Sequence, residues 1–241
     1  MRRSTKANTA LAGSSTYSEV NDADLATRIV AELRALRSER DIAGMRRFGI
    51  VAHGEQLGVS VTKLREIGRP FRKNHELALR LWASGIHEAR VLATIIEDPT
   101  QTTKRQMERW ARNCDNWAVT DAMAFVFDRT RYAEEMVKRW SRHKSEYVKR
   151  AAFSIIAGMA VHRKELPDEI FLDHLPIIVR EATDERNFVR KAVNWALRGI
   201  GKRNAGLRHA AITTAKEIAK IDSRAARWIA SDALRELQAR M

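Results

Sequence analysis

The sequence predicts an all-helical protein in which amphipathic helices stack into a solenoid. From Asp22 onward, apolar residues recur at steps of three and four, as in Leu25, Ile29, Leu33 and Leu36. This is the spacing of one face of an α-helix. No stretch alternates in the manner of a β-strand, and related segments recur along the chain. A length of 241 residues suits one sizeable domain or a short array of helical repeats.

The N-terminal segment differs in composition from the rest of the chain. Residues 1–20 lack the continuous apolar stretch of a signal peptide. No apolar run approaches the roughly 18 residues that span a bilayer. We therefore interpret residues 1–20 as a flexible basic leader and residues 21–241 as the folded domain. Two alternatives stay open for the leader: Arg2, Arg3 and Lys6 tether DNA, or the segment has no functional consequence.

Breaker and capping residues predict where the helices begin and end. Thr103, followed by Gln106, is a capping box that opens a helix. The residues that close predicted helices are Gly68 with Pro70, Gly85, and Asp98 with Pro99. Their spacing predicts helices of about 10–18 residues with short connections.

Internal repeats indicate how these helices are arranged. The segment VKRAAFSIIAGMAVHR begins at Val148, and VRKAVNWALRGIGKRN begins 41 residues later at Val189. A third segment, RAARWIASDAL, aligns Trp228 with Trp195 at an offset of 33 residues. Periods in this range are typical of HEAT and armadillo repeats, in which helix pairs share a core and present a long concave face. A globular helical bundle is the alternative architecture.

The charge balance predicts a polyanionic partner. The chain has 44 Lys and Arg against 30 Asp and Glu, a formal charge of +14. With 44% hydrophobic residues, it is a folded core that carries excess charge, not a disordered basic tail. Cys114 is the only cysteine, which excludes an internal disulfide and a Cys-rich metal site and fits a reducing compartment. We expect a cytoplasmic protein that reaches the nucleoid through DNA binding.

One predicted helix places an indole among cations. Over residues 187–200, the apolar stripe consists of Val189, Val193, Ala196, Leu197 and Ile200. Lys191, Trp195, Arg198 and Lys202 lie on another face at steps of four, three and four. Trp195 is either part of a basic cleft or an edge of the core covered by basic side-chain stems.

A second predicted helix pairs an aromatic residue with an acid. Trp117 and Asp121 are four residues apart and share one face, while Val119 and its apolar neighbours face the core. Asp121 is alternatively a surface acid or the partner of an arginine. In the predicted helix over residues 146–162, Arg150 and Ser154 project away from the apolar side. Arg150 is either a solvated charge or a group that holds a phosphate.

Taken in order along the chain, these segments resemble the AlkD-type DNA alkylation repair glycosylase family. The motifs are VKRAAF, WAVTD, VRKAVNWALRGIGKRN and RAARWIASDALREL, and the similarity runs from about Met45 to about Leu237. The resemblance implies a right-handed superhelical solenoid of HEAT-like repeats with a basic concave face. It also implies a DNA N-glycosylase that hydrolyses the N-glycosidic bond of positively charged N3- and N7-alkylated purines, such as 3-methyladenine and 7-methylguanine. The product is an abasic site in base excision repair.

The resemblance assigns roles to individual residues. It places the catalytic aromatic and acid on Trp117 and Asp121, and a second cleft tryptophan on Trp195. The N-terminal aromatic that approaches DNA falls on Phe48. The chain departs from the pattern at Ala118, where we expect an acidic residue in many members. The predicted DNA-binding residues are Arg150, Lys149, Arg190, Lys191, Lys202, Arg203 and Phe48.

The predicted chemistry needs neither metal nor cofactor. An alkylated purine is already cationic, so its bond to deoxyribose is primed to break, and positive charge then develops on the sugar. Asp121 would stabilise that charge and position the attacking water, with duplex DNA bound by a protein monomer and no membrane involved. The rival is a non-catalytic HEAT-like scaffold that binds DNA or protein. A metal-dependent nuclease is disfavoured because the seven histidines form no ligand-like cluster.

Overall fold

The computed structural model describes residues 21–239, and over that range it contains thirteen α-helices, one 3₁₀ turn and no strand. The all-helical prediction is confirmed. The residues of the proposed leader, Arg2, Arg3 and Lys6, lie outside the described range. The elements are α1 Asp22–Ala35, α2 Glu39–Arg47, α3 Val61–Gly68, η1 Arg69–Phe71, α4 His75–Ala83, α5 His87–Ile96, α6 Lys104–Asn113, α7 Trp117–Phe127, α8 Ala133–Trp140, α9 Glu146–His162, α10 Asp168–Glu181, α11 Asn187–Gly201, α12 Ala205–Ile218 and α13 Arg224–Gln238.

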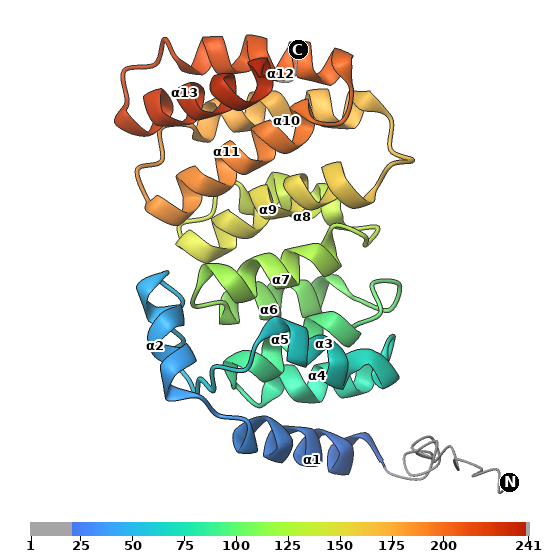
Figure 1. The fold of residues 1–241 in the computed structure, drawn as a ribbon. Helices are drawn as coiled ribbons and strands as arrows, with labels where there is room; N and C mark the ends of the chain where they lie inside the picture. Colours follow the sequence, from blue (N-terminus) through green and yellow to red (C-terminus); the bar gives the residue numbers. More distant parts are fainter. Residues whose placement is uncertain (1–20, 240–241) are drawn as a thin grey trace, which may run out of the picture.

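The helices stack in two layers along one axis (Figure 1). Helices α5, α7, α9, α11 and α13 contact one another in sequence and form one layer. Helices α4, α6, α8, α10 and α12 each pack against a member of that layer, as expected for helix pairs that share a core. The predicted HEAT-like repeat architecture is therefore the one observed. Among the described residues, no helix is both long and apolar enough to cross a membrane.

Side-chain caps explain where many of these helices begin. Asn116 Oδ1 accepts hydrogen bonds from the backbone of Ala118 and Val119 at the start of α7. Such a bond satisfies one of the free N–H groups that every helix start exposes. Thr103 caps α6 through Gln106 N, at 3.2 Å, as predicted. The Gln106 side chain, however, donates to Glu97 at 2.6 Å, so only the threonine half of the capping box forms.

One hydrophobic core runs the length of the stack, from Leu25 to Leu237. The stripe predicted for α11 from Val189 to Ile200 is fully buried. In the N-terminal half of the stack, the Trp82 and Trp110 rings lie parallel, with centroids 4.1 Å apart. Cys114 is buried beside them, and this burial raises the pKa of its thiol to about 12, so the thiol is inert.

Helix α2 stands at the side of the stack and is held at its ends (Figure 1). Only Ile42 of this helix is buried. At its N-terminal end, Ser38 N donates to Leu57 O at 2.8 Å. The close approach requires glycine at position 58, where φ is +76° and a Cβ would lie 2.5 Å from Ser38 O. The position of α2 matters because its C-terminal end reaches the candidate site.

Candidate nucleic-acid site on the α7 to α13 layer

The six tryptophans divide into two groups. Trp82, Trp110 and Trp140 are buried in the core, with at most 3% of each residue exposed. The other three, Trp117, Trp195 and Trp228, are partly exposed and belong to α7, α11 and α13. Large aromatic residues left partly in water on one layer mark a surface suited to stacking or cation binding.

Asp121 lies at the centre of this surface and is held by two neighbours on α9. Arg150 donates to both carboxylate oxygens, from Nε to Oδ1 at 2.9 Å and from Nη2 to Oδ2 at 2.7 Å. Ser154 Oγ donates to Oδ1 at 2.8 Å. The Asp121 side chain is 18% exposed, whereas that of Arg150 is 7% exposed. The carboxylate thus keeps one open side, while the guanidinium beneath it fixes its orientation.

An open hollow of about 480 Å³ lies in front of this carboxylate. Two of the predicted catalytic residues, Asp121 and Trp195, line it together with Arg150 and Lys191. The third, Trp117, is outside the lining, and its ring lies 5.9 Å from the Arg150 guanidinium carbon. The structure therefore brings Asp121 and Trp195 to one hollow and leaves Trp117 beside the arginine that holds Asp121.

Trp195 is supported by a row of rings. Its centroid lies 5.6 Å from that of Phe125, and the Phe125 ring meets the His162 ring edge-on at 5.0 Å. His162 Nδ1 in turn contacts Oδ2 of the buried Asp128. Burial raises the pKa of Asp128 to about 6, although the hydrogen bond from His162 opposes the rise. This support limits the motion of the indole in the hollow.

Trp117 is tied to α2 through the main chain. Its indole Nε1 donates to Phe48 O at 2.8 Å, across 69 residues of sequence. The Phe48 side chain itself is 74% exposed. Ala118, where the chain departs from the family pattern, lines a separate pocket beneath α2. Two of the aromatic residues predicted for the site, Phe48 and Trp117, are therefore joined by a hydrogen bond.

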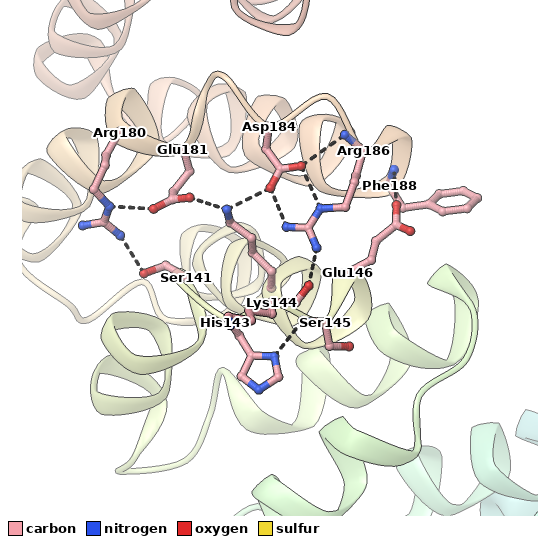
Figure 2. Close-up of polar contacts among 11 residues, drawn as sticks. Ser141, His143, Lys144, Ser145, Glu146, Arg180, Glu181, Asp184, Arg186 and Phe188 are labelled. Atoms are coloured by element: carbon pink, nitrogen blue, oxygen red, sulfur yellow. Dashed lines mark hydrogen bonds and ion pairs between the residues drawn. The ribbon is translucent and has the colours of Figure 1, made fainter.

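Lys149 is directed into an ion-pair network, not toward solvent. Its ammonium pairs with Glu181 and with Asp184, the latter at 2.8 Å, and the residue is 8% exposed. Figure 2 shows Asp184 also receiving the Arg186 guanidinium. Burial alone would raise the pKa of Asp184, but the hydrogen bonds from Arg186 and Lys149 lower it to about 2. The network joins the start of α9 to the end of α10 and to the loop that leads into α11.

Three of the other predicted DNA-binding cations, Lys202, Arg203 and Arg190, also have protein partners. Lys202 forms an ion pair with Glu236. Arg203 donates to three backbone carbonyls at the end of α9 and in the loop that follows it. Arg190 lies over the Trp228 ring at 5.1 Å. Lys191 is exposed in the hollow, and no hydrogen bond or ion pair joins it to another described residue.

Sequence reasoning missed the α13 side of the hollow. Trp228 and Asp232 line it, and Asn194 Nδ2 donates to Asp232 at 2.7 Å. The signal was present, because WIASD repeats the spacing of WAVTD, with the aromatic and the acid four residues apart. The hollow thus holds two carboxylates on opposite walls with aromatic faces between them. Such an arrangement can stabilise a cation that enters between the walls.

Comparison with known proteins agrees with this description. Residues 29–237 match the sequence profile of the family described as "DNA alkylation repair enzyme". A protein of Listeria innocua, described as uncharacterized, is 25% identical over 194 residues, which cover 79% of this chain and 84% of that protein. A solved structure described as "A new family of proteins related to the HEAT-like repeat DNA glycosylases with affinity for branched DNA structures" has a TM-score of 0.71 and 22% identity. The match covers 87% of this chain and 94% of that one.

Proposed function

Because this chain belongs to the DNA alkylation repair enzyme family, we propose that it is a DNA N-glycosylase that removes cationic N3- and N7-alkylated purines from duplex DNA. The observation that carries the proposal is the Asp121 carboxylate, oriented by Arg150 and Ser154 at the edge of a hollow that Trp195 also lines. The product is an abasic site, and the protein acts as a monomer associated with the nucleoid.

In the proposed mechanism, Asp121 acts on the sugar and not on the base. As the N-glycosidic bond lengthens, the leaving purine takes up the bonding electrons and loses its positive charge, while the sugar becomes oxocarbenium-like. A carboxylate already held in place requires no reorganisation when that charge develops. A water that then attacks the sugar carbon transfers its proton to solvent or to Asp121 as the sugar hydroxyl forms.

Arg150 is proposed as a positioning residue rather than as the phosphate anchor. Its Nε and Nη2 atoms bond to Asp121, and its Nη1 atom donates to Phe188 O at 2.6 Å. All three nitrogen atoms of the guanidinium are therefore engaged within the protein. We propose that Lys191, which is exposed beside Trp195 in the hollow, contacts the phosphate in place of Arg150.

A second candidate function is a scaffold that binds DNA without cleaving the glycosidic bond. It is favoured by the many internal ion pairs on this layer, which hold Asp232 and Asp121 against arginines. The structural neighbour described by its affinity for branched DNA belongs to a family related to glycosylases, which makes this alternative concrete. Both functions need the same surface, so only a measurement of base release separates them.

The test is base release from duplex DNA that contains 7-methylguanine, measured with EDTA present. We expect release by the wild type, and we expect Asp121→Asn to slow it by about 100-fold or more while duplex affinity stays within about twofold. Asp173→Asn, an exposed site on α10, is the matched control. Tight binding without release at stoichiometric protein would replace the proposal with the scaffold. Equal release by Asp121→Asn would remove Asp121 from the mechanism.

A further inference from the structure

A pocket of about 680 Å³ lies beneath α2, and no described residue lines both this pocket and the hollow. Helix α2 roofs it with Gly44, Met45 and Phe48, and Ala118 and Phe125 of α7 form part of its wall. Helices α3 and α5 supply apolar side chains such as Leu64 and Val91, together with the polar side chains of Arg65, His87 and Glu88. Its volume is in the range of small-molecule sites, which are about 300–1,000 Å³.

The pocket has aromatic residues at both its roof and its wall. Phe48 is 74% exposed although its backbone carbonyl is fixed by Trp117. Phe125, on the opposing side, is held edge-on by His162. A large apolar ring kept in water by a fixed main chain is suited to stack on a planar ligand. Small residues leave the space open, since a Cβ on Gly44 would meet no heavy atom within 4 Å.

Three arginines whose guanidinium groups are unbonded within the described residues lie around the mouth of this pocket, whereas a fourth lining arginine, Arg129, donates to Phe125 O at 3.0 Å. Arg65 and Arg72 line it, and together with Arg69 they also line an adjoining open groove. No hydrogen bond or ion pair joins these three guanidinium groups to another residue of the described range, in contrast to Arg150 and Arg203. Unpaired guanidinium groups in a row are what a phosphodiester strand requires.

The acids near the pocket leave this positive charge in excess. Glu88 accepts backbone bonds from Leu57 and Gly58 at 2.8 and 2.7 Å. Asp41 accepts from Ser38 Oγ, and Glu66 pairs with Lys63. Each carboxylate therefore has its own donor, so the three arginines remain available to an anionic ligand.

We propose that this pocket, which we call the α2 pocket, is a second nucleic-acid site that takes an unpaired nucleobase. The base stacks between Phe48 and Phe125, and the flanking phosphates lie on Arg65, Arg69 and Arg72. Phe125 adjoins both sites, because it lines the α2 pocket and its ring centroid lies 5.6 Å from that of Trp195 in the hollow. The proposal rests on the DNA-binding part of the proposed function and not on base release.

The test compares two fluorescein-labelled duplexes of the same sequence, one fully paired and one with a single unpaired thymidine. Fluorescence anisotropy gives the affinity of the full-length protein for each. We expect the wild type to prefer the duplex with the unpaired base by at least about fivefold, from base stacking on aromatic side chains. Equal affinities for the two duplexes would overturn the proposal.

Two variants that fill the pocket test its location. Gly44→Leu and Ala122→Trp should each bring the preference close to one, while Ala83→Trp, at an exposed position on α4, should keep it. Replacing a glycine inside a helix favours the helix, so Gly44→Leu does not depend on tolerance of a packed core. A preference that survives in both filled variants would contradict the proposed pocket.

A charge-matched pair of variants tests the arginines. Arg65→Gln combined with Arg72→Gln should reduce the slope of log affinity against log salt by roughly 1.8. The control combines Arg80→Gln with Arg109→Gln, two exposed arginines of the outer helices α4 and α6, and should leave the slope nearly unchanged. Equal slopes in the two double variants would remove the arginines from the site. Wild-type protein that prefers the unpaired base but releases no 7-methylguanine would refute the proposed glycosylase alone.

Discussion

Helices α7 and α13 carry the same short element, and its two copies differ in how their neighbours hold them. Trp117 and Asp121 on α7, like Trp228 and Asp232 on α13, are four residues apart. Each indole lies beside a guanidinium, from Arg150 at 5.9 Å and from Arg190 at 5.1 Å. Local geometry therefore does not distinguish the two copies.

The difference lies in the arginine that each acid meets. Arg150 is 7% exposed and makes two short hydrogen bonds to Asp121. Arg198 is 26% exposed, lies 3.6 Å from Asp232 and also pairs with Glu236. The α7 copy is a preorganised carboxylate, whereas the α13 copy belongs to a looser surface network. The comparison teaches that rigidity comes from the adjacent helix and not from the element.

The largest expected contrast is in stability. Arg150→Gln should lower the free energy of unfolding by about 3 kcal/mol, because it leaves the Asp121 carboxylate without its buried partner. Arg198→Gln, at a more exposed pair, should cost less than about 1 kcal/mol. Urea denaturation followed by circular dichroism measures both values. Equal losses in the two variants would break the distinction between the two copies.

The tryptophans should differ in their effect on base release. Trp117→Ala should slow release of 7-methylguanine about tenfold, since it removes the ring beside Arg150 and the tie to α2. Trp228→Ala should slow it by less than about threefold. Single-turnover kinetics give these rates, and Trp117→Phe, which keeps a ring but loses the N–H donor, separates the two contributions. A larger loss from Trp228→Ala would reverse the ranking.

The Lys149 network tests whether the rigidity of α9 is what sets α7 apart. The pKa of Asp184 is lowered to about 2, against about 4 in an unfolded chain. Its stabilisation is therefore complete above pH 4 and is lost as the pH falls toward 2. Asp184→Asn should lower the melting temperature by about 4 °C at pH 7 and by almost nothing near pH 2. A difference that does not change with pH would exclude this ion pair as its source.

The smallest effect on base release is expected for Asp232, the acid of the α13 copy. Asp232→Asn should leave base release within about twofold of the wild type, because Asn194 and the nearby arginines hold that position within the protein. The same single-turnover assay measures it beside Asp121→Asn. A loss comparable to that of Asp121→Asn would mean that both walls of the hollow take part in the chemistry.

Periodicity in the sequence predicted which face each residue occupies. The helical class and the α11 core stripe followed from it, as did the placement of Asp121 and Trp195 away from the core. The core stripe and the placement of these two residues depend only on spacing within one helix. Trp228 and Asp232 were within reach of the same reasoning, since their spacing repeats that of Trp117 and Asp121.

Partners on neighbouring helices could not be predicted in this way. Lys149 and Arg150 are adjacent cations, so composition treats them alike, yet one binds Asp184 and the other binds Asp121. The choice depends on which acid lies nearby in space, Asp184 of the loop before α11 or Asp121 of α7, across 35 and 29 residues of sequence respectively. The position of α2 could not be predicted either, because it depends on the close approach at Gly58 and on the main-chain carbonyl of Phe48.

The bond from Trp117 to Phe48 uses a carbonyl oxygen, which every amino acid supplies. The side chain at position 48 can therefore be exchanged without loosening the attachment of α2 to α7. Attachment and ligand preference become independently adjustable at this residue. A library of substitutions at position 48 would vary what the protein selects while leaving its architecture constant.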